Sequence, residues 1–313
     1  MRLPLALLAT ATAAALTLTG CTAAPEPEAT AGASSDLIEV EGEFGEEPSV
    51  DFPTPLTPSE TQCTEVIEGE GELIQEGQYV LLGASILNGE TGEVIQAVGY
   101  GDENPAPLVV GGSETPVAFT KGLTCAREGS RVAVAASPAD LVLPGEDPAP
   151  TEGQPSLVLV FDVQRAFLPK ADGAPQLTRD GFPAVVTAPD GRPGITVPDA
   201  EPFETTEVEV IKAGGGEVVE DGDQVVVHYT GVLWSDNEVF DSTWEQGGPT
   251  VFTVSEGEGS QVVPGFSKAI IGQEVGSQVG VVVAPEDGYG DTDQAGIPAG
   301  STLFFVIDIL GVV

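Results

Sequence analysis

The fold of this chain is decided by one stretch, QVVVHYTGVL at residues 224–233. Its β-branched and aromatic residues favour an extended strand. Further runs of the same kind predict strands at residues 208–211, 251–254, 278–283 and 303–312. Many short strands in succession predict an antiparallel sheet.

One segment among these strands has the signals of a helix. Pro264 suits the first helical turn, Phe266 and Ile270 lie on one helix face, and Gly272 is placed to end the helix after residue 271. The 40 glycines and 26 prolines of the chain favour short elements and turns elsewhere. The predicted class is therefore α+β, with an antiparallel sheet wrapped on one short helix.

The same pattern occurs twice along the chain. Residues 48–53, PSVDFP, recur as residues 193–198, PGITVP, and further pairs of glycines and apolar residues follow in the same order. Two long copies predict a domain duplication rather than a solenoid. The predicted domains are residues 48–169 and 193–313, with a linker over residues 170–192.

The first residues have the features of a bacterial export signal. Met1-Arg2 supplies a positive end, and residues 3–18 are apolar but too short to span a membrane. Residues 18–21, LTGC, resemble a lipobox, in which the cysteine thiol receives a diacylglyceryl group. We therefore expect a signal peptide over residues 1–20 and an extracytoplasmic protein, anchored to the cell membrane by lipidated Cys21. A plain signal peptide with an incidental cysteine is the alternative.

The segment after Cys21 and the remaining cysteines fit an exported protein. Residues 21–47 are rich in Ala, Pro, Ser, Thr and Glu, with few apolar groups to order them, so we expect a lipidated flexible tether. Cys63 and Cys125 then remain as a pair. An even pair in an exported protein predicts one disulfide between them.

The composition excludes several classes of function. The 313-residue chain has 10 basic and 50 acidic side chains, a net charge of −40, so its surface repels nucleic acids. The single histidine, His228, is expected to be a packed strand residue rather than a catalyst. Without a cluster of His and Cys, we expect no metal site. The Gly-rich runs lack the lysine of a phosphate-binding loop, and no cofactor is expected.

Several motifs stand together in the second copy. They are VHYTG at 227–231, VFDS at 239–242, VVPGF at 262–266, PEDGYG at 285–290 and TLFF at 302–305. The series resembles FKBP-type peptidyl-prolyl cis-trans isomerases over nearly all of residues 206–313. The whole layout resembles tandem FKBP lipoproteins of high-GC Gram-positive bacteria. Three positions differ from what relatives often carry, with Gln246 for Arg, Thr250 for an aromatic residue and Gln261 for Glu.

The resemblance implies an aromatic cleft that takes a Xaa-Pro peptide. Phe266 would be its floor, with polar contacts from Asp241, the Val263 backbone N–H and the Tyr289 hydroxyl. The walls would be Tyr229, Phe240, Val262, Ile297 and Phe305. An apolar cleft favours the twisted transition state, because twisting removes the polar C–N double-bond character of the planar amide. The expected partners are unfolded or proline-containing exported proteins, together with macrolide ligands.

The first copy lacks these side chains. Ala84, Ile95-Gln96, Pro116 and Val142 stand where the second copy has Tyr229, Phe240-Asp241, Val263 and Tyr289. Proline has no backbone N–H to donate, and the aromatic walls are gone. We expect a degenerate FKBP-like fold at residues 48–169. Two functions stay open for the chain: a prolyl isomerase, or a membrane-anchored chaperone or adaptor that binds clients without needing catalysis.

Overall fold

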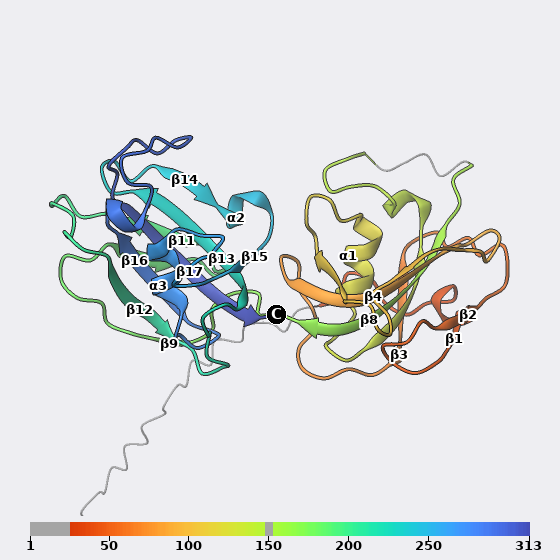
Figure 1. Ribbon diagram of the computed structural model, residues 1–313. Helices are drawn as coiled ribbons and strands as arrows, with labels where there is room; N and C mark the ends of the chain where they lie inside the picture. Colours follow the sequence, from red (N-terminus) through yellow and green to blue (C-terminus); the bar gives the residue numbers. More distant parts are fainter. Residues whose placement is uncertain (1–25, 148–152) are drawn as a thin grey trace, which may run out of the picture.

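Two antiparallel β-sheets account for most of the computed structural model, which describes residues 26–147 and 153–313 (Figure 1). The first sheet lies in the red-to-green half of the chain and the second in the green-to-blue half. The prediction of antiparallel sheets with few helices is confirmed. The predicted signal peptide and Cys21 lie outside the described residues, and no helix within those residues is long and apolar enough to cross a membrane.

The second sheet is built around β13 (Gln224–Leu233), which is the QVVVHYTGVL stretch. Its strand order is β14-β13-β17-β16-β12-β9, and β15 also pairs with β13. The predicted strands and helix are present, and several of them have the predicted bounds. The elements of this half are β9 (Ala174–Pro175), β10 (Ala184–Thr187), β11 (Pro193–Thr196), β12 (Glu207–Ala213), β13 (Gln224–Leu233), β14 (Val239–Ser242), α2 (Thr243–Gln246), β15 (Thr250–Thr253), α3 (Pro264–Ile270), β16 (Gln278–Val283), η3 (Pro285–Asp287) and β17 (Leu303–Val312).

The first half repeats this arrangement with the sheet order β3-β7-β8-β4-β5, and β6 also pairs with β4. Helix α1 packs on this sheet as α3 packs on the second. The elements of this half are η1 (Ser35–Leu37), β1 (Glu39–Glu41), β2 (Ser49–Asp51), β3 (Gln62–Ile67), β4 (Tyr79–Asn88), β5 (Val94–Val98), β6 (Ala106–Val109), α1 (Val117–Leu123), β7 (Arg131–Ala136), η2 (Pro138–Asp140) and β8 (Leu157–Ala166).

The two sheets share irregularities as well as strand order. The β4–β8 ladder shifts register between Leu81 and Leu82. The β13–β17 ladder shifts between Val226 and Val227, at the corresponding place. In each ladder the shift ends two residues before the position in question, at Leu82 before Ala84 and at Val227 before Tyr229. Ala84 on β4 therefore occupies the position that Tyr229 has on β13.

The prediction of a flexible tether over residues 21–47 is wrong for most of the part that the structure describes. Strands β1 and β2 form a hairpin on the first sheet. Buried Arg131 binds Asp162 through two nitrogens, each 2.6 Å from a carboxylate oxygen, and donates to the backbone carbonyl of Gly42 at 2.8 Å. The Gly45 N–H donates to Asp162 at 2.7 Å. Composition missed this order because carbonyl groups that satisfy a buried ion pair can come from any residue type.

The prediction of a linker over residues 170–192 is also wrong in part. Strand β10 pairs with β11 in a hairpin that matches β1–β2, and both hairpins cover the sheet face opposite the helix. Phe182, just before β10, is buried against Phe304, with ring centroids 5.5 Å apart. The sequence repeat at residues 48–53 and 193–198 therefore marks the second strand of each hairpin. Where one domain ends and the next begins stays a prediction.

Cysteine residues link two elements of the first half. The structure joins Cys63, on β3, to Cys125, just after α1, as a disulfide. The bridge closes a sequence separation of 62 residues. A loop of this length is expected to stabilise the fold by about 4 kcal/mol, largely through the entropy of the unfolded chain.

Candidate active site

A cleft of about 490 Å³ opens where α3 faces the second sheet. Aromatic rings from four strands and from the helix form most of its surface. The lining residues are Tyr229, Phe240, Asp241, Phe252, Ser260, Gln261, Val262, Val263, Phe266, Tyr289 and Phe305. All of the predicted site residues of the second copy except Ile297 are among them.

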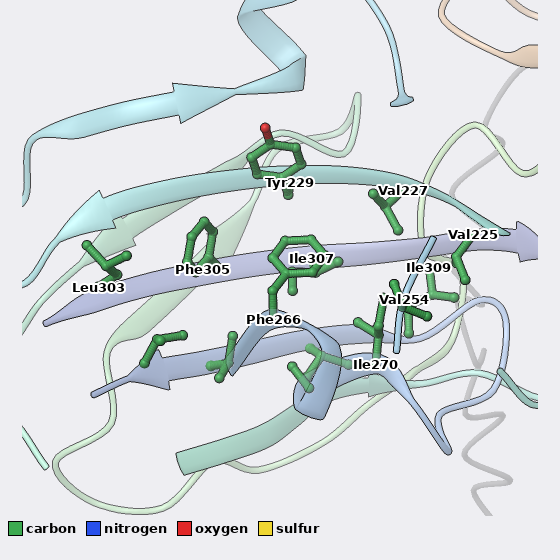
Figure 2. Packing of buried hydrophobic residues seen from close by; sticks show 14 of the residues in the cluster. Val225, Val227, Tyr229, Val254, Phe266, Ile270, Leu303, Phe305, Ile307 and Ile309 are labelled. Carbon is green, nitrogen blue, oxygen red and sulfur yellow. The ribbon is translucent and has the colours of Figure 1, made fainter. Parts of the chain in front are cut away.

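Phe266 lies at the centre of the aromatic cluster. Its ring meets Tyr229 at 5.7 Å and Phe305 at 5.5 Å between centroids, both edge to face. Figure 2 shows why these rings meet: Tyr229 on β13 and Phe305 on β17 project from the same face of the sheet toward the helix that carries Phe266. Strand alternation puts every second side chain on this face. The Phe240 ring completes this side of the cleft, 5.5 Å from Phe305.

One glycine makes room for two of these rings. A Cβ atom on Gly231 would lie 2.5 Å from the Phe240 ring and 2.8 Å from the Phe305 ring. No real Cβ contact is that short, so any larger residue would displace the rings. The glycine of the VHYTG motif is therefore a packing requirement of the aromatic wall.

Strand β13 has a gap in its pairing at the level of Tyr229. One edge of β13 pairs with β17. Along the other edge, β15 pairs with residues 224–227 and β14 with residues 230–232. The Thr243 hydroxyl fills the gap by accepting from the Tyr229 N–H at 2.9 Å. A side-chain hydroxyl thus replaces a strand partner and fixes the backbone that carries the Tyr229 ring.

Asp241 lies at the rim of the cleft with both carboxylate oxygens engaged. The Tyr229 hydroxyl donates to Oδ2, and the Gln246 amide donates to Oδ1 at 2.7 Å. Burial and the nearby carboxylate raise the pKa of the Tyr229 hydroxyl well above its usual value, so it stays a proton donor at neutral pH. The negative group thus holds one aromatic wall in place through a charge-assisted hydrogen bond.

The start of α3 supplies a backbone donor. Val263 is the residue before the helix and Pro264 is its first residue, so the chain at Val263 is extended, with φ −62° and ψ 150°. Among the described residues, no group accepts a hydrogen bond from the Val263 N–H. Val262 and Val263 both line the cleft, which leaves this donor available to a ligand.

Tyr289 approaches the cleft from the loop that follows η3. Its side chain is half-buried, and burial followed by the charge of Asp241 raises the pKa of its hydroxyl. A protonated phenol at this position is a hydrogen-bond donor at every pH at which the protein is expected to work. Asp241 and Tyr289 thus provide the polar edge of an otherwise apolar cleft.

Two residues differ from the predicted site. Ile297 is 5 % exposed and packs in the core cluster beneath the cleft, so it supports the wall rather than lining it. Phe252 was missed, although it lines the cleft and lies 6.0 Å from Phe266. The short strand that carries Phe252 has no sequence pattern that shows which of its faces is buried. The register of β15 on β13 places Phe252 on the cleft side.

His228 projects from the face of β13 opposite to Tyr229, as alternation requires. Its ring stacks on Trp244 with centroids 3.8 Å apart, and its Nδ1 lies 2.9 Å from the Thr243 hydroxyl. Burial lowers the pKa of His228 to about 4. It is therefore a neutral, packed ring outside the cleft.

The residues that line this cleft lie within a stretch that matches a known protein family. The family model described as FKBP-type peptidyl-prolyl cis-trans isomerase matches residues 215–310. A protein of Streptomyces anulatus named FK506-binding protein is 34 % identical over 123 residues, which are 39 % of this chain and 97 % of that protein. The chain belongs to the FKBP-type peptidyl-prolyl cis-trans isomerase family.

Other FKBP proteins are also similar to this chain. FkpA of Escherichia coli K12, named as an FKBP-type peptidyl-prolyl cis-trans isomerase, is 36 % identical over 104 residues, 33 % of this chain and 36 % of FkpA. The crystal structure of FkpA from Escherichia coli aligns with a TM-score of 0.32 and 30 % identity over 43 % of this chain and 52 % of that one. The chain thus covers almost all of the Streptomyces FKBP but about a third of FkpA.

Proposed function

We propose that the cleft of the second copy, residues 193–313, catalyses Xaa-Pro isomerisation in exported proteins. The observation that carries the proposal is the aromatic cleft around Phe266, with the Val263 N–H available at its edge. The chain is an FKBP-type peptidyl-prolyl cis-trans isomerase by family, and this cleft has the side chains that the reaction needs.

The reaction requires no nucleophile, metal or cofactor. The barrier to amide rotation is about 18–20 kcal/mol and comes from C–N resonance. Lowering it by about 5.5 kcal/mol accelerates rotation about ten-thousandfold. The aromatic walls disfavour the solvated planar amide, while the Val263 N–H and the Tyr289 hydroxyl hold the peptide as the bond turns. Asp241 contributes by fixing the Tyr229 ring.

The first copy is proposed to keep the fold without the site. Ala84 stands at the position of Tyr229, and Gln96 pairs across the sheet as Asp241 does. Ile95, the equivalent of Phe240, is 58 % exposed and faces solvent instead of an aromatic neighbour. Pro116, just before α1, has no N–H to offer where Val263 has one.

Export and lipidation are proposed on the sequence of residues 1–21 alone. Metabolic labelling with a radioactive fatty acid should mark the wild-type protein in its bacterial host, and Cys21→Ala should lose the label and leave the membrane fraction. A wild-type chain that stays unlabelled and soluble in the cytoplasm would refute the anchor.

A second candidate function is client binding without catalysis. It is favoured by the adjacent apolar residues Val94 and Ile95 on β5, which are 57 % and 58 % exposed. Substitution of Tyr289 and Asp241 together separates the two functions. An isomerase would lose rate acceleration, whereas a binding module would still suppress aggregation of a client without cis-prolines.

The direct test uses the full chain and a matched pair of variants. Phe240→Ala should lower kcat/KM on a short Xaa-Pro peptide at least tenfold, or about 1.4 kcal/mol in the barrier. Ile95→Ala, at the equivalent position of the first copy, should leave it unchanged. An FK506-type macrolide should inhibit the wild type by filling the aromatic cleft. Equal losses in both variants, or no acceleration by the folded wild type, would contradict the proposed site.

A further inference from the structure

The two halves of the protein contact each other directly. The segment that joins the two sheets bonds to both, since the Phe167 N–H donates to the Tyr79 carbonyl at 3.0 Å and the Leu168 N–H to the Leu310 carbonyl at 3.3 Å. An apolar cluster between the halves includes Phe167, Leu310 and Val226, with Tyr79 packed against them. These contacts fix the first copy beside the strands that carry the cleft.

A groove of about 470 Å³ runs between the copies beyond this contact. One wall is the end of β6 and the loop after it, and the other is the turn between α2 and β15. Val109 approaches the second copy so closely that a Cβ on Gly248 would lie 2.4 Å from its side chain. The lining residues are Pro107, Leu108, Val109, Gly112, Ser113, Glu114, Thr115, Gln246, Gly247, Gly248, Pro249 and Thr250.

The groove adjoins the aromatic cleft. Thr250 lines the groove and Phe252 lines the cleft, and both project from the same face of β15 because they are two residues apart. Gln246 lines the groove while its amide holds Asp241 in the cleft at 2.7 Å. A chain leaving the cleft past these residues enters the groove within about two residues, since a strand advances about 3.4 Å per residue.

The chemistry of the groove fits an extended polypeptide. Glu114 is the one charged side chain in its lining, and the remaining lining is made of prolines, aliphatic side chains, small polar groups and glycines. Glycine backbone and hydroxyl groups offer hydrogen bonds to a peptide main chain without selecting its side chains. Such a surface suits clients of varied sequence.

We propose that this groove is a second subsite of the isomerase, which binds residues of an unfolded client that flank the Xaa-Pro bond. The first copy, which lacks the aromatic and polar side chains of the active-site cleft, supplies one wall. The inference rests on the function proposed above and adds to it. It assigns the degenerate copy a role in holding long substrates, with no part in the reaction of short ones.

The kinetic test uses the full chain and fills the groove from the first copy. Ser113 is exposed in the groove, and Ser59 is exposed elsewhere on the same half. The two substrates are a tetrapeptide and a peptide with about four further residues on each side, enough to extend about 13 Å beyond it at either end. Ser113→Trp should lower kcat/KM for the long peptide about fivefold, mostly through KM, and leave the tetrapeptide unaffected. Ser59→Trp should change neither.

Two outcomes would overturn the subsite. An equal loss of kcat/KM on both peptides would mean that the tryptophan at position 113 acts on the cleft itself, through Gln246 and Asp241. No loss on either would mean that clients do not use the groove.

A cross-linking measurement separates the subsite from catalysis. A photoreactive phenylalanine at position 113 should cross-link to the long peptide, and an excess of tetrapeptide should reduce the yield because it displaces the Xaa-Pro anchor. The same group at position 59 is the control. Cross-linking in a chain without isomerase activity would refute the proposed function and keep the subsite. Isomerase activity without cross-linking would refute the subsite and leave the proposed function standing.

Discussion

The Tyr229 hydroxyl donates a hydrogen bond to the carboxylate of Asp241, across the antiparallel pair β13–β14. The two residues are not directly opposite each other, since Gly231 is the partner of Asp241. The tyrosine therefore reaches diagonally over the glycine, and this geometry ties one aromatic wall of the cleft to its charged rim. Gln246 holds the other oxygen of the same carboxylate.

The first prediction concerns this bond. Tyr229→Phe keeps the ring and removes the donor, so Asp241 retains only the Gln246 contact. We expect kcat/KM on a short Xaa-Pro peptide to fall about fivefold and stability to fall by about 1 kcal/mol, the usual value of one such hydrogen bond. Tyr79→Phe, a tyrosine of the first copy, is the control for assay and folding. An unchanged rate would show that the bond does not order the cleft.

The second prediction tests the glycine beneath the rings. Gly231→Ala would put a methyl group against Phe240 and Phe305, so we expect a loss of about 1–3 kcal/mol in stability together with most of the activity. Gly215→Ala is the matched control, because a Cβ there has nothing within 4 Å. Denaturant unfolding and the peptide assay measure the two effects. A stable and fully active Gly231→Ala protein would contradict the packing described here.

The third prediction is a dependence of stability on pH. Burial lowers the pKa of His228 from 6.5 to about 4, so the folded state favours the neutral ring. The stability that neutral His228 provides is complete above pH 6.5 and is lost as the pH falls from 6.5 toward 4. The loss over that window is on the order of 3 kcal/mol.

The variant for this prediction is His228→Gln, which has no titrating group and keeps a polar side chain beside Thr243. Chemical unfolding at pH 7 and pH 4.5 should show a smaller loss for the variant than for the wild type. Identical losses would mean that carboxylates elsewhere, and not the stacked histidine, cause the acid sensitivity.

The fourth prediction concerns the N-terminal segment. Arg131→Met leaves Asp162 buried without its cation, and breaking a buried pair in this way costs about 3–5 kcal/mol. The bond from Arg131 to the Gly42 carbonyl is lost with it, so limited proteolysis should cut within residues 39–51 sooner than in the wild type. Arg127→Met, whose bond to the Gly71 carbonyl is exposed, is the control. Equal protease sensitivity of both variants would show that Arg131 does not hold this segment.

Long strands and recurring motifs were predictable from the sequence because their information is local. The β-branched run of β13 and the Pro264 start of α3 specify an element without reference to the rest of the chain. The hairpins β1–β2 and β10–β11 were missed for the opposite reason. Each has very short strands that are ordered by what lies beneath them, such as the buried Arg131 under the first hairpin. The amino-acid composition of a segment gives no information about such contacts.

The cleft residues also divide into those that a local motif predicts and those that depend on distant contacts. Tyr229, Phe266 and Phe305 belong to motifs whose spacing is local, and the structure brings them together. Phe252 joins them only through the register of β15 on β13, which no local pattern reveals. The groove between the copies depends on how two separate sheets pack, and a sequence without a structure gives no measure of that packing.

The ordered N-terminal segment would limit how far a lipid-anchored chain can stand from a membrane. Glu28 already bonds to Thr124 on the first copy, at 3.2 Å, and Ala29 is buried there. If Cys21 carries a lipid, the six or so intervening residues reach about 20 Å when fully extended. The anchoring segment is then short, and the isomerase would stay close to the bilayer surface, where exported chains first emerge.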